Sequence, residues 1–206
     1  MPRSAEWLFF DVGSTLVDES CAYEHRLREI ADAAQVAYKE VYALALDFYK
    51  QNRKGDREAA NRLGVPMPSW HKEHERLYED TVACLQELSG RYKIGVIANQ
   101  SPGTETRLSQ YGISEYIDLV VASAEAGVSK PNLRIFQLAL SRAGCKPQNA
   151  IMIGDRIDND IIPAKSMGMR TVWIRQGLWG KCWSITKEEE RADYMVDSLA
   201  ELCRLL

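Results

Sequence analysis

Short apolar segments recur along the chain and alternate with amphipathic ones. The apolar runs are rich in valine, isoleucine or aromatic residues and end at glycine, aspartate, asparagine or serine, which is typical of buried strands. Their continuous apolar character favours parallel strands covered on both faces. The predicted strands are WLFFD (7–11), KIGVIA (93–98), DLVVAS (118–123), AIMIGD (150–155), RTVWI (170–174) and YMV (194–196).

Helical patterns separate these runs. Leu133, Phe136 and Leu140 recur at helical spacing, and Gly144 is placed to end that helix. Asp160 is a possible N-cap for another helix. The alternation of strands and helices predicts an α/β fold with a doubly wound, mainly parallel, Rossmann-like sheet. Further helices are predicted over 80–90, 160–169 and 198–206.

One block interrupts the alternation. Residues 19 to about 76 contain no convincing strand, and this stretch is too long for a simple crossover. Residues 21–51 look helical, a second helical pair is predicted after Lys54, and the proline-containing LGVPMPSW (63–70) forms a break. We therefore predict an α/β core from residues 1–17 and 77–206, with a small all-helical subdomain, the cap, from residues 18–76.

Composition excludes several classes of function. The 206 residues are 46% hydrophobic and 27% charged, which is ordinary for a globular protein. The net charge of −3 gives no signal for nucleic acid, and no apolar run approaches the ~20 residues of a membrane span. No secretory signal is evident, and the five cysteines form no C-x-x-C pair, so we expect a cytoplasmic protein with reduced thiols, as a monomer or homodimer.

Acidic residues follow two predicted strands at their carboxyl ends. Asp11 closes the first strand, Asp155 closes AIMIGD, and Asp160 follows five residues later. Because strand carboxyl ends form the ligand crevice of a doubly wound sheet, we expect these acids to meet there. Grouped carboxylates repel each other unless a cation lies between them, and oxygen ligands favour Mg²⁺. Lys130 is placed to neutralise a carboxylate or bind a phosphate oxygen.

Four segments resemble the motifs of the haloacid dehalogenase-like hydrolase superfamily, and the resemblance covers nearly the whole chain. The last two are the more specific, because they combine KP with GD and a second aspartate five residues on. The helical block after the first motif resembles the cap of the subfamily that carries an insertion there. The segments are DVGSTLVD (11–18), VIANQ (96–100), VSKPNLRIF (128–136) and IMIGDRIDNDIIPAKSMGM (151–169).

This resemblance implies a Mg²⁺-dependent phosphatase that acts on a small phosphorylated metabolite. Asp11 would be the nucleophile and form an aspartyl-phosphate. The Asp11 carboxylate, the backbone carbonyl of Gly13 and the Asp155 carboxylate would hold Mg²⁺. Asp160 would be a further ligand or support the others. Lys130 would bind the phosphoryl group and offset the charge of the acids.

Two positions depart from the family pattern. Gly13 stands where the family usually has a second aspartate, the general acid and base, so we expect reduced turnover. Ala98 stands where a serine or threonine usually offers its hydroxyl to the phosphate. Asn99, Gln100 and Ser101 are the candidates for contacting the phosphate in its place, with helix capping as the rival role for Asn99.

Several alternatives stay open at this point. The residues that follow the first motif, Asp18, Glu19 and His25, are candidates to replace the missing proton donor. A metal-independent 2-haloacid dehalogenase also lacks the second aspartate, but such enzymes usually carry tyrosine there and lack an acid-rich fourth motif. A third alternative is a weak catalyst that binds a phosphorylated ligand.

Other polar residues are expected to be structural. His71 and His74 lie three residues apart, but a zinc site needs further ligands and none is evident nearby. We therefore expect both at the surface of a helix. Arg156 and Asp158 are likewise expected at the surface. The tyrosines and phenylalanine of the cap are expected in its own core, with one or two lining a substrate pocket.

Overall fold

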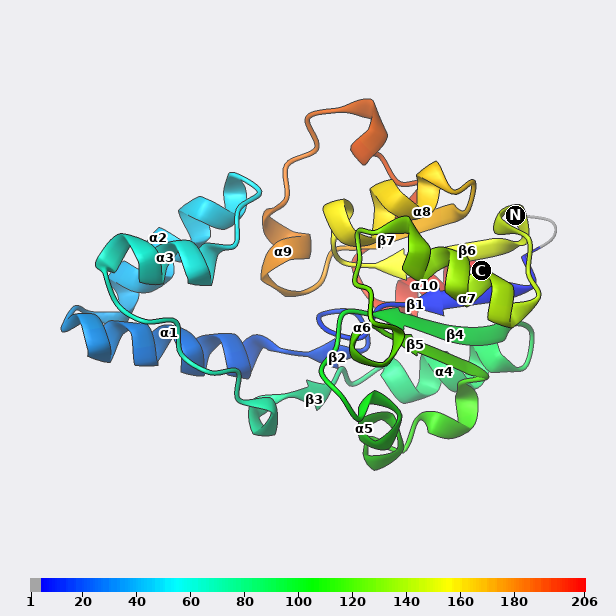
Figure 1. Cartoon of the computed structure of the whole chain (residues 1–206), viewed down its shortest axis with the longest axis horizontal. Coiled ribbons are helices and arrows are strands. Elements are labelled where there is room, and N and C mark those ends of the chain that lie inside the picture. Colours follow the sequence, from blue (N-terminus) through cyan, green and yellow to red (C-terminus); the bar gives the residue numbers. More distant parts are fainter. Residues whose placement is uncertain (1–4) are drawn as a thin grey trace.

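A six-stranded parallel sheet forms the centre of the core (Figure 1). The structure, a computed structural model, describes residues 5–206, so the first four residues of the predicted core lie outside the described residues. The first strand, residues 7–10, lies inside the sheet. The next two strands of the sheet along the chain lie on one side of it, and the last three lie on the other side. This arrangement confirms the doubly wound, Rossmann-like α/β fold and all six predicted strands. Their order in the sheet is β5 (Leu119–Ala122), β4 (Lys93–Ala98), β1 (Trp7–Phe10), β6 (Ala150–Gly154), β7 (Arg170–Ile174) and β8 (Tyr194–Val196).

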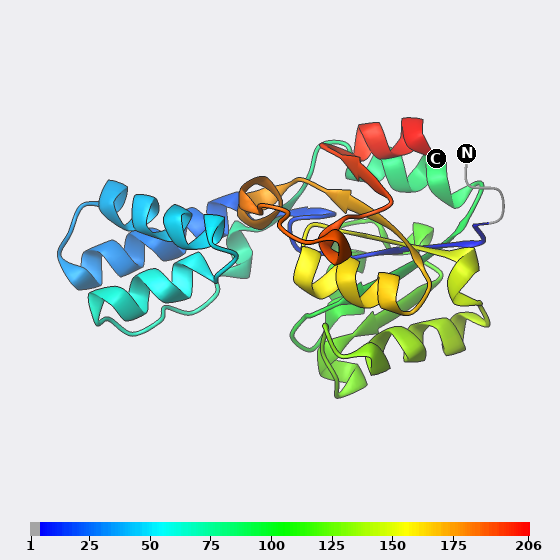
Figure 2. The ribbon, with the colours of Figure 1, turned by 90° about the horizontal axis from the view of Figure 1, so that it is seen from above.

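Helices cover both faces of this sheet (Figure 2), which explains the continuous apolar strands. In β1, Leu8 and Phe10 are fully buried on one face, and Phe9 is fully buried on the other. The first face packs against α4 (Thr81–Ser89), α5 (Thr104–Gln110) and α10 (Leu199–Leu205), and the second against α7 (Leu133–Ala143) and α8 (Ile162–Ser166). The short helices α6 (Ser123–Ala126) and α9 (Gly177–Cys182) follow β5 and β7.

Three helices of the cap project from the carboxyl end of the sheet (Figures 1 and 2). Buried side chains from each, among them Ile30, Tyr49 and Ala59, form a separate apolar cluster, which Trp179 of α9 joins. Two short antiparallel strands, which the sequence did not predict, pair where the chain leaves and re-enters the core. The helices are α1 (Ser20–Ala34), α2 (Tyr38–Lys50) and α3 (Gly55–Leu63), and the strands are β2 (Val17–Asp18) and β3 (Arg76–Leu77).

The structure corrects two predictions of helical structure. After Lys54 the cap holds one α-helix, α3, and not a pair, because Gly64 ends it in the left-handed conformation and an extended segment follows as far as the 3₁₀ turn η1 (Lys72–His74). Asp160 does not cap a helix. It lies inside the single π-turn η4 (Ile157–Ile161), and its carboxylate accepts the backbone N–H of Arg156, which precedes it. Within residues 5–206, no helix is both long and apolar enough to cross a membrane.

Candidate active site

Four charged residues meet at the carboxyl end of the sheet. The buried Lys130 ammonium donates to Oδ1 of Asp11 at 2.7 Å and to Oδ1 of Asp160 at 2.5 Å. Carboxylate oxygens of Asp11, Asp155 and Asp160 all lie within 4.8 Å of one another. The structure therefore brings together the four residues that the sequence singled out, although they come from three separate parts of the chain.

The parallel sheet explains why these side chains meet. Asp11 and Asp155 each follow directly after a strand, and β1 and β6 are neighbours. Gly154 has no side chain, and a Cβ atom at this position would overlap the carboxylate of Asp160. The missing side chain of Gly154 therefore leaves room for the Asp160 carboxylate next to the end of β6. Oδ2 of Asp160 accepts a hydrogen bond from the backbone N–H of Arg156 at 3.0 Å.

Asn99 positions Lys130. Its side-chain oxygen accepts the backbone N–H of Lys130 at 2.7 Å, and its side-chain nitrogen donates to the Lys130 carbonyl at 2.9 Å. Two bonds from one amide fix the loop that carries the lysine. In this structure Asn99 contacts the loop directly, and its role as a phosphate ligand stays a prediction.

The charge of the cluster fits a divalent cation. Three carboxyl groups face one ammonium group, so acidic groups outnumber cationic ones among these four buried residues. Burial, with the neighbouring charges of Asp11 and Asp160, raises the pKa of Asp155 well above its usual value. Among residues 5–206, no side chain or backbone N–H donates to the Asp155 carboxylate. An oxygen-only donor set with an unpaired carboxylate is what a hard cation such as Mg²⁺ requires.

Glu19 fills the space left by Gly13. A Cβ atom at residue 13 would lie 2.5 Å from Oε1 of Glu19. The other oxygen, Oε2, accepts a hydrogen bond from the Ser14 hydroxyl at 2.9 Å. Burial raises the pKa of Glu19 to about 8, and the charges of Glu75 and Asp11 act in the same direction. This shift favours the protonated form of the Glu19 carboxyl group, next to the nucleophile candidate.

The other two candidates for a replacement proton donor lie elsewhere. Asp18 accepts hydrogen bonds from the Arg76 guanidinium and from the backbone N–H of Ser20. His25 lies in the cap next to His71. Neither Asp18 nor His25 lines the cavity that Asp11 and Glu19 share.

This cavity has a volume of about 170 Å³ and a mainly polar wall. Lys130 and the backbone of Gly13 line it, and so does Gln100. Ser101 does not. Its hydroxyl contacts the Lys72 ammonium at the surface, so its predicted contact with phosphate has no support here. Ala98 is fully buried in β4, and its methyl group offers no replacement for the missing hydroxyl.

Sequence reasoning missed part of the cavity wall. Arg156, expected at the surface, lies 3.6 Å from the ring centre of Trp179 and is held by the Asp158 carboxylate at 2.8 and 2.5 Å. Arg156 and Trp179 line the cavity, together with Asn159 and the cap residue Tyr23. The one feature of the sequence that could have indicated a site role for Arg156 is its position directly after Asp155, at the end of a predicted strand.

Comparison with known proteins gives curated relatives that are phosphatases. Glyceraldehyde 3-phosphate phosphatase from Methanocaldococcus jannaschii is 37% identical over 129 residues, which cover 62% of this chain and 55% of that protein. The match thus spans little more than half the length of that relative. The phosphatase of the same name from Methanothermobacter thermautotrophicus is 30% identical over 194 residues, covering 83% of this chain and 86% of that protein.

A family model and a solved structure also match most of the chain. The structure of the HAD-hydrolase YfnB from Bacillus subtilis, bound to magnesium, has a TM-score of 0.72 at 16% identity, covers 99% of both chains and has the same fold. The family model described as haloacid dehalogenase-like hydrolase matches residues 8–174, from β1 through β7. With the site geometry above, this match places the chain in an enzyme family: it belongs to the haloacid dehalogenase-like hydrolases.

Proposed function

We propose that this hydrolase is a Mg²⁺-dependent phosphatase of small phosphate esters. The observation that carries the proposal is the contact of the buried Lys130 ammonium with both Asp11 and Asp160, beside the unpaired Asp155 carboxylate. The relatives named glyceraldehyde 3-phosphate phosphatase support a phosphate ester as the substrate. The cavity of about 170 Å³ favours a substrate of a few carbon atoms. A screen of small phosphate esters, with and without Mg²⁺, tests the proposal.

In this mechanism Asp11 attacks phosphorus and forms an aspartyl-phosphate, while the alcohol leaves. Lys130 holds Asp11 in place and offsets the charge on the phosphoryl oxygens. Asp11, the Gly13 carbonyl and Asp155 would hold Mg²⁺, with Asp160 as a ligand or supporting group. The bound ion would supply positive charge to stabilise the transferring group. We also propose residues 18–76 as a cap that selects the substrate, because Tyr23 reaches the cavity from α1.

We assign the acid and base role to Glu19. Its carboxyl group occupies the space into which a side chain on residue 13 would project, and it lines the same cavity as Asp11. A protonated carboxyl group there is placed to give its proton to the leaving alcohol. The resulting carboxylate then accepts a proton from the water that hydrolyses the aspartyl-phosphate. Glu19 would thus supply the acid and base that residue 13 cannot. A site with this group favours an enzyme over a protein that only binds a phosphorylated ligand.

Replacing Glu19 with glutamine should lower kcat/KM, which reports the step in which the alcohol leaves, by roughly 10²–10⁴-fold for alkyl phosphates, because their alkoxide leaving groups need a proton. The loss should be much smaller for 4-nitrophenyl phosphate, whose phenolate leaves without one. Steady-state kinetics on both substrates measure the difference. Asp18→Asn is the matched control and should leave both rates unchanged, because Asp18 contacts Arg76 and Ser20 and does not line the cavity. Equal losses on both substrates would remove the assignment.

A reciprocal exchange tests the same space. Gly13→Asp alone should displace the Glu19 carboxyl group, because a Cβ atom at residue 13 overlaps the end of that side chain. Gly13→Asp combined with Glu19→Ala should recover activity above that of Glu19→Ala, since the carboxyl group returns from the other side. If the double variant is no more active than Glu19→Ala, the two positions do not share one function.

Removal of metal separates a phosphatase from a metal-independent dehalogenase. EDTA should abolish hydrolysis of phosphate esters, and excess Mg²⁺ should restore it, because the three carboxyl groups would otherwise lack the cation that lets them ionise together. Asp155→Asn should raise the Mg²⁺ concentration needed for half-maximal activity by at least about tenfold. Activity that persists in EDTA, with release of halide from 2-haloacids, would support the dehalogenase alternative instead.

Cytoplasmic location and a monomeric or homodimeric state stay predictions.

A further inference from the structure

The three histidines of the chain gather at one place in the cap, although His25 is far from His71 and His74 in the sequence. The ring centres of His25 and His71 lie 4.7 Å apart, and those of His25 and His74 lie 4.4 Å apart. His25 and Glu29 are one turn apart on α1, whereas His71 and His74 belong to the segment that leads back to the core. The folded cap thus supplies the additional ligand candidates that were not evident near His71 in the sequence.

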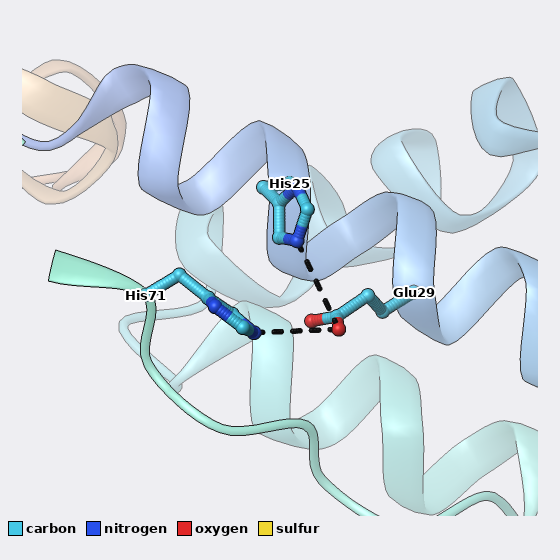
Figure 3. A group of neighbouring side chains, drawn as sticks. All are labelled: His25, Glu29 and His71. Atoms are coloured by element: carbon cyan, nitrogen blue, oxygen red, sulfur yellow. Dashed lines mark ion pairs between the residues drawn. The ribbon is translucent and has the colours of Figure 1, made fainter. Parts of the chain in front are cut away.

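Three ligand atoms of this group point toward one another (Figure 3). Oε1 of Glu29 lies 3.4 Å from Nε2 of His71 and 3.8 Å from Nε2 of His25. Tetrahedral zinc with ligand bonds of about 2.0–2.1 Å separates its ligand atoms by about 3.3 Å. The two distances to Glu29 are therefore close to those between corners of such a site, and all three ligand atoms lie within 4.8 Å of one another.

The surroundings of these residues also suit a metal ion. Nδ1 of His71 lies 2.9 Å from a carboxylate oxygen of Glu73. When the neutral ring carries its proton on Nδ1, Glu73 accepts that N–H and the lone pair of Nε2 faces Glu29. A carboxylate behind the ring is the usual support for a histidine that binds a metal. Oε2 of Glu29 is shielded from solvent and has no hydrogen-bond partner among residues 5–206. These two observations, independent of the spacing, point to a cation between Glu29 and the two imidazoles.

We propose that His25, Glu29 and His71 form a second metal site, selective for Zn²⁺ and similar transition-metal ions. Imidazole nitrogens suit such ions, whereas the all-oxygen site of the core suits Mg²⁺. The site joins α1, where the cap begins, to the segment just before β3, where the cap ends. A bound ion cross-links the two connections on which the cap would move, so it stabilises the cap and limits its motion over the cavity.

Histidine signals in NMR test this site, because every histidine of the chain lies in the cluster and none lies in the core site. Zn²⁺ is titrated into the full-length protein with Mg²⁺ in excess, and long-range ¹H–¹⁵N spectra of the imidazoles are recorded. We expect one equivalent of Zn²⁺ to shift Nε2 of His25 and of His71, and to raise the Tm. Metal-bound Nε2 signals at both rings would support the site at atomic resolution.

Variants give the comparison. His25→Ala, His71→Ala and Glu29→Gln should each weaken Zn²⁺ binding in calorimetry by more than roughly tenfold. Glu24→Gln, on the same helix but paired with Arg28, should bind as wild type does. Zn²⁺ that binds without shifting the histidine signals, or binds Glu29→Gln and wild type equally, would overturn the proposal. In Asp155→Asn, Zn²⁺ should shift the histidine signals as it does in the wild type, because Asp155 belongs to the other site. The Zn²⁺ result is therefore independent of the proposed phosphatase function.

Discussion

Asp11→Asn should reduce phosphatase turnover to below roughly one thousandth of the wild-type value, because an amide cannot form the aspartyl-phosphate. The substitution keeps the shape of the side chain and removes one of the three negative charges at the site. We therefore expect the variant to fold, with a Tm at least equal to that of the wild type in EDTA. Initial rates on the best ester from the screen, and melting curves of the same samples, provide both measurements.

Asp118→Asn is the control for this variant. Asp118 precedes β5 and therefore lies at the amino end of the sheet, opposite Asp11, where its carboxylate accepts the N–H of Ile94 and contacts Lys93. Its rate should stay close to that of the wild type after correction for the folded fraction. If Asp11→Asn hydrolyses the same esters as fast as Asp118→Asn does, Asp11 is not the nucleophile.

Lys130→Met should have the largest effect on stability. The ammonium group is almost fully buried between Asp11 and Asp160, and removing it leaves two buried carboxylates without their counterion. Breaking a buried ion pair on one side costs about 3–5 kcal/mol. We expect the free energy of unfolding, measured by urea denaturation in EDTA at neutral pH, to fall by about that amount. Turnover should also be lost, because Lys130 holds the nucleophile.

Two further variants isolate the cause of that loss. Lys93→Met removes an exposed lysine that pairs with Asp118, and it should change the stability little, because exposed ion pairs contribute little. Adding Asp160→Asn to Lys130→Met removes one unpaired carboxylate, so part of the lost stability should return while turnover stays absent. A Lys130→Met protein as stable as Lys93→Met would contradict the buried pair described here.

Residues at strand ends were predictable from the sequence. Apolar runs give the strands, the parallel sheet brings their carboxyl ends together, and Asp11 and Asp155 follow directly. Predicting that Lys130 belongs to the site required the family motif, because the spacing of residues alone does not show that its side chain points inward. Asp160 was expected near the site, but its role as an N-cap was wrong, since a π-turn directs its carboxylate back to Arg156 and Lys130.

Residues that depend on how the cap packs were not predictable. Glu19 was one of three candidates for the proton donor. We prefer it because α1 begins directly after it and its carboxyl group lies next to Gly13, which the sequence does not show. The same holds for the histidines, because the contact of His25 with His71 requires the chain to cross the whole cap and return. The hydrophobic pattern specifies that the cap is helical, but it carries no information on which polar side chains then meet.

In the proposed mechanism, Asp11 carries the phosphoryl group during turnover. A reaction with the best phosphate ester and Mg²⁺, quenched in acid within the first turnover, should yield a phosphorylated peptide whose modified residue is Asp11 by mass spectrometry. The same quench of Glu19→Gln with 4-nitrophenyl phosphate, whose leaving group needs no proton, should show more of this phosphopeptide, because hydrolysis of the intermediate loses its base. Continued release of phosphate with no phosphorylated Asp11 in either protein would contradict the account.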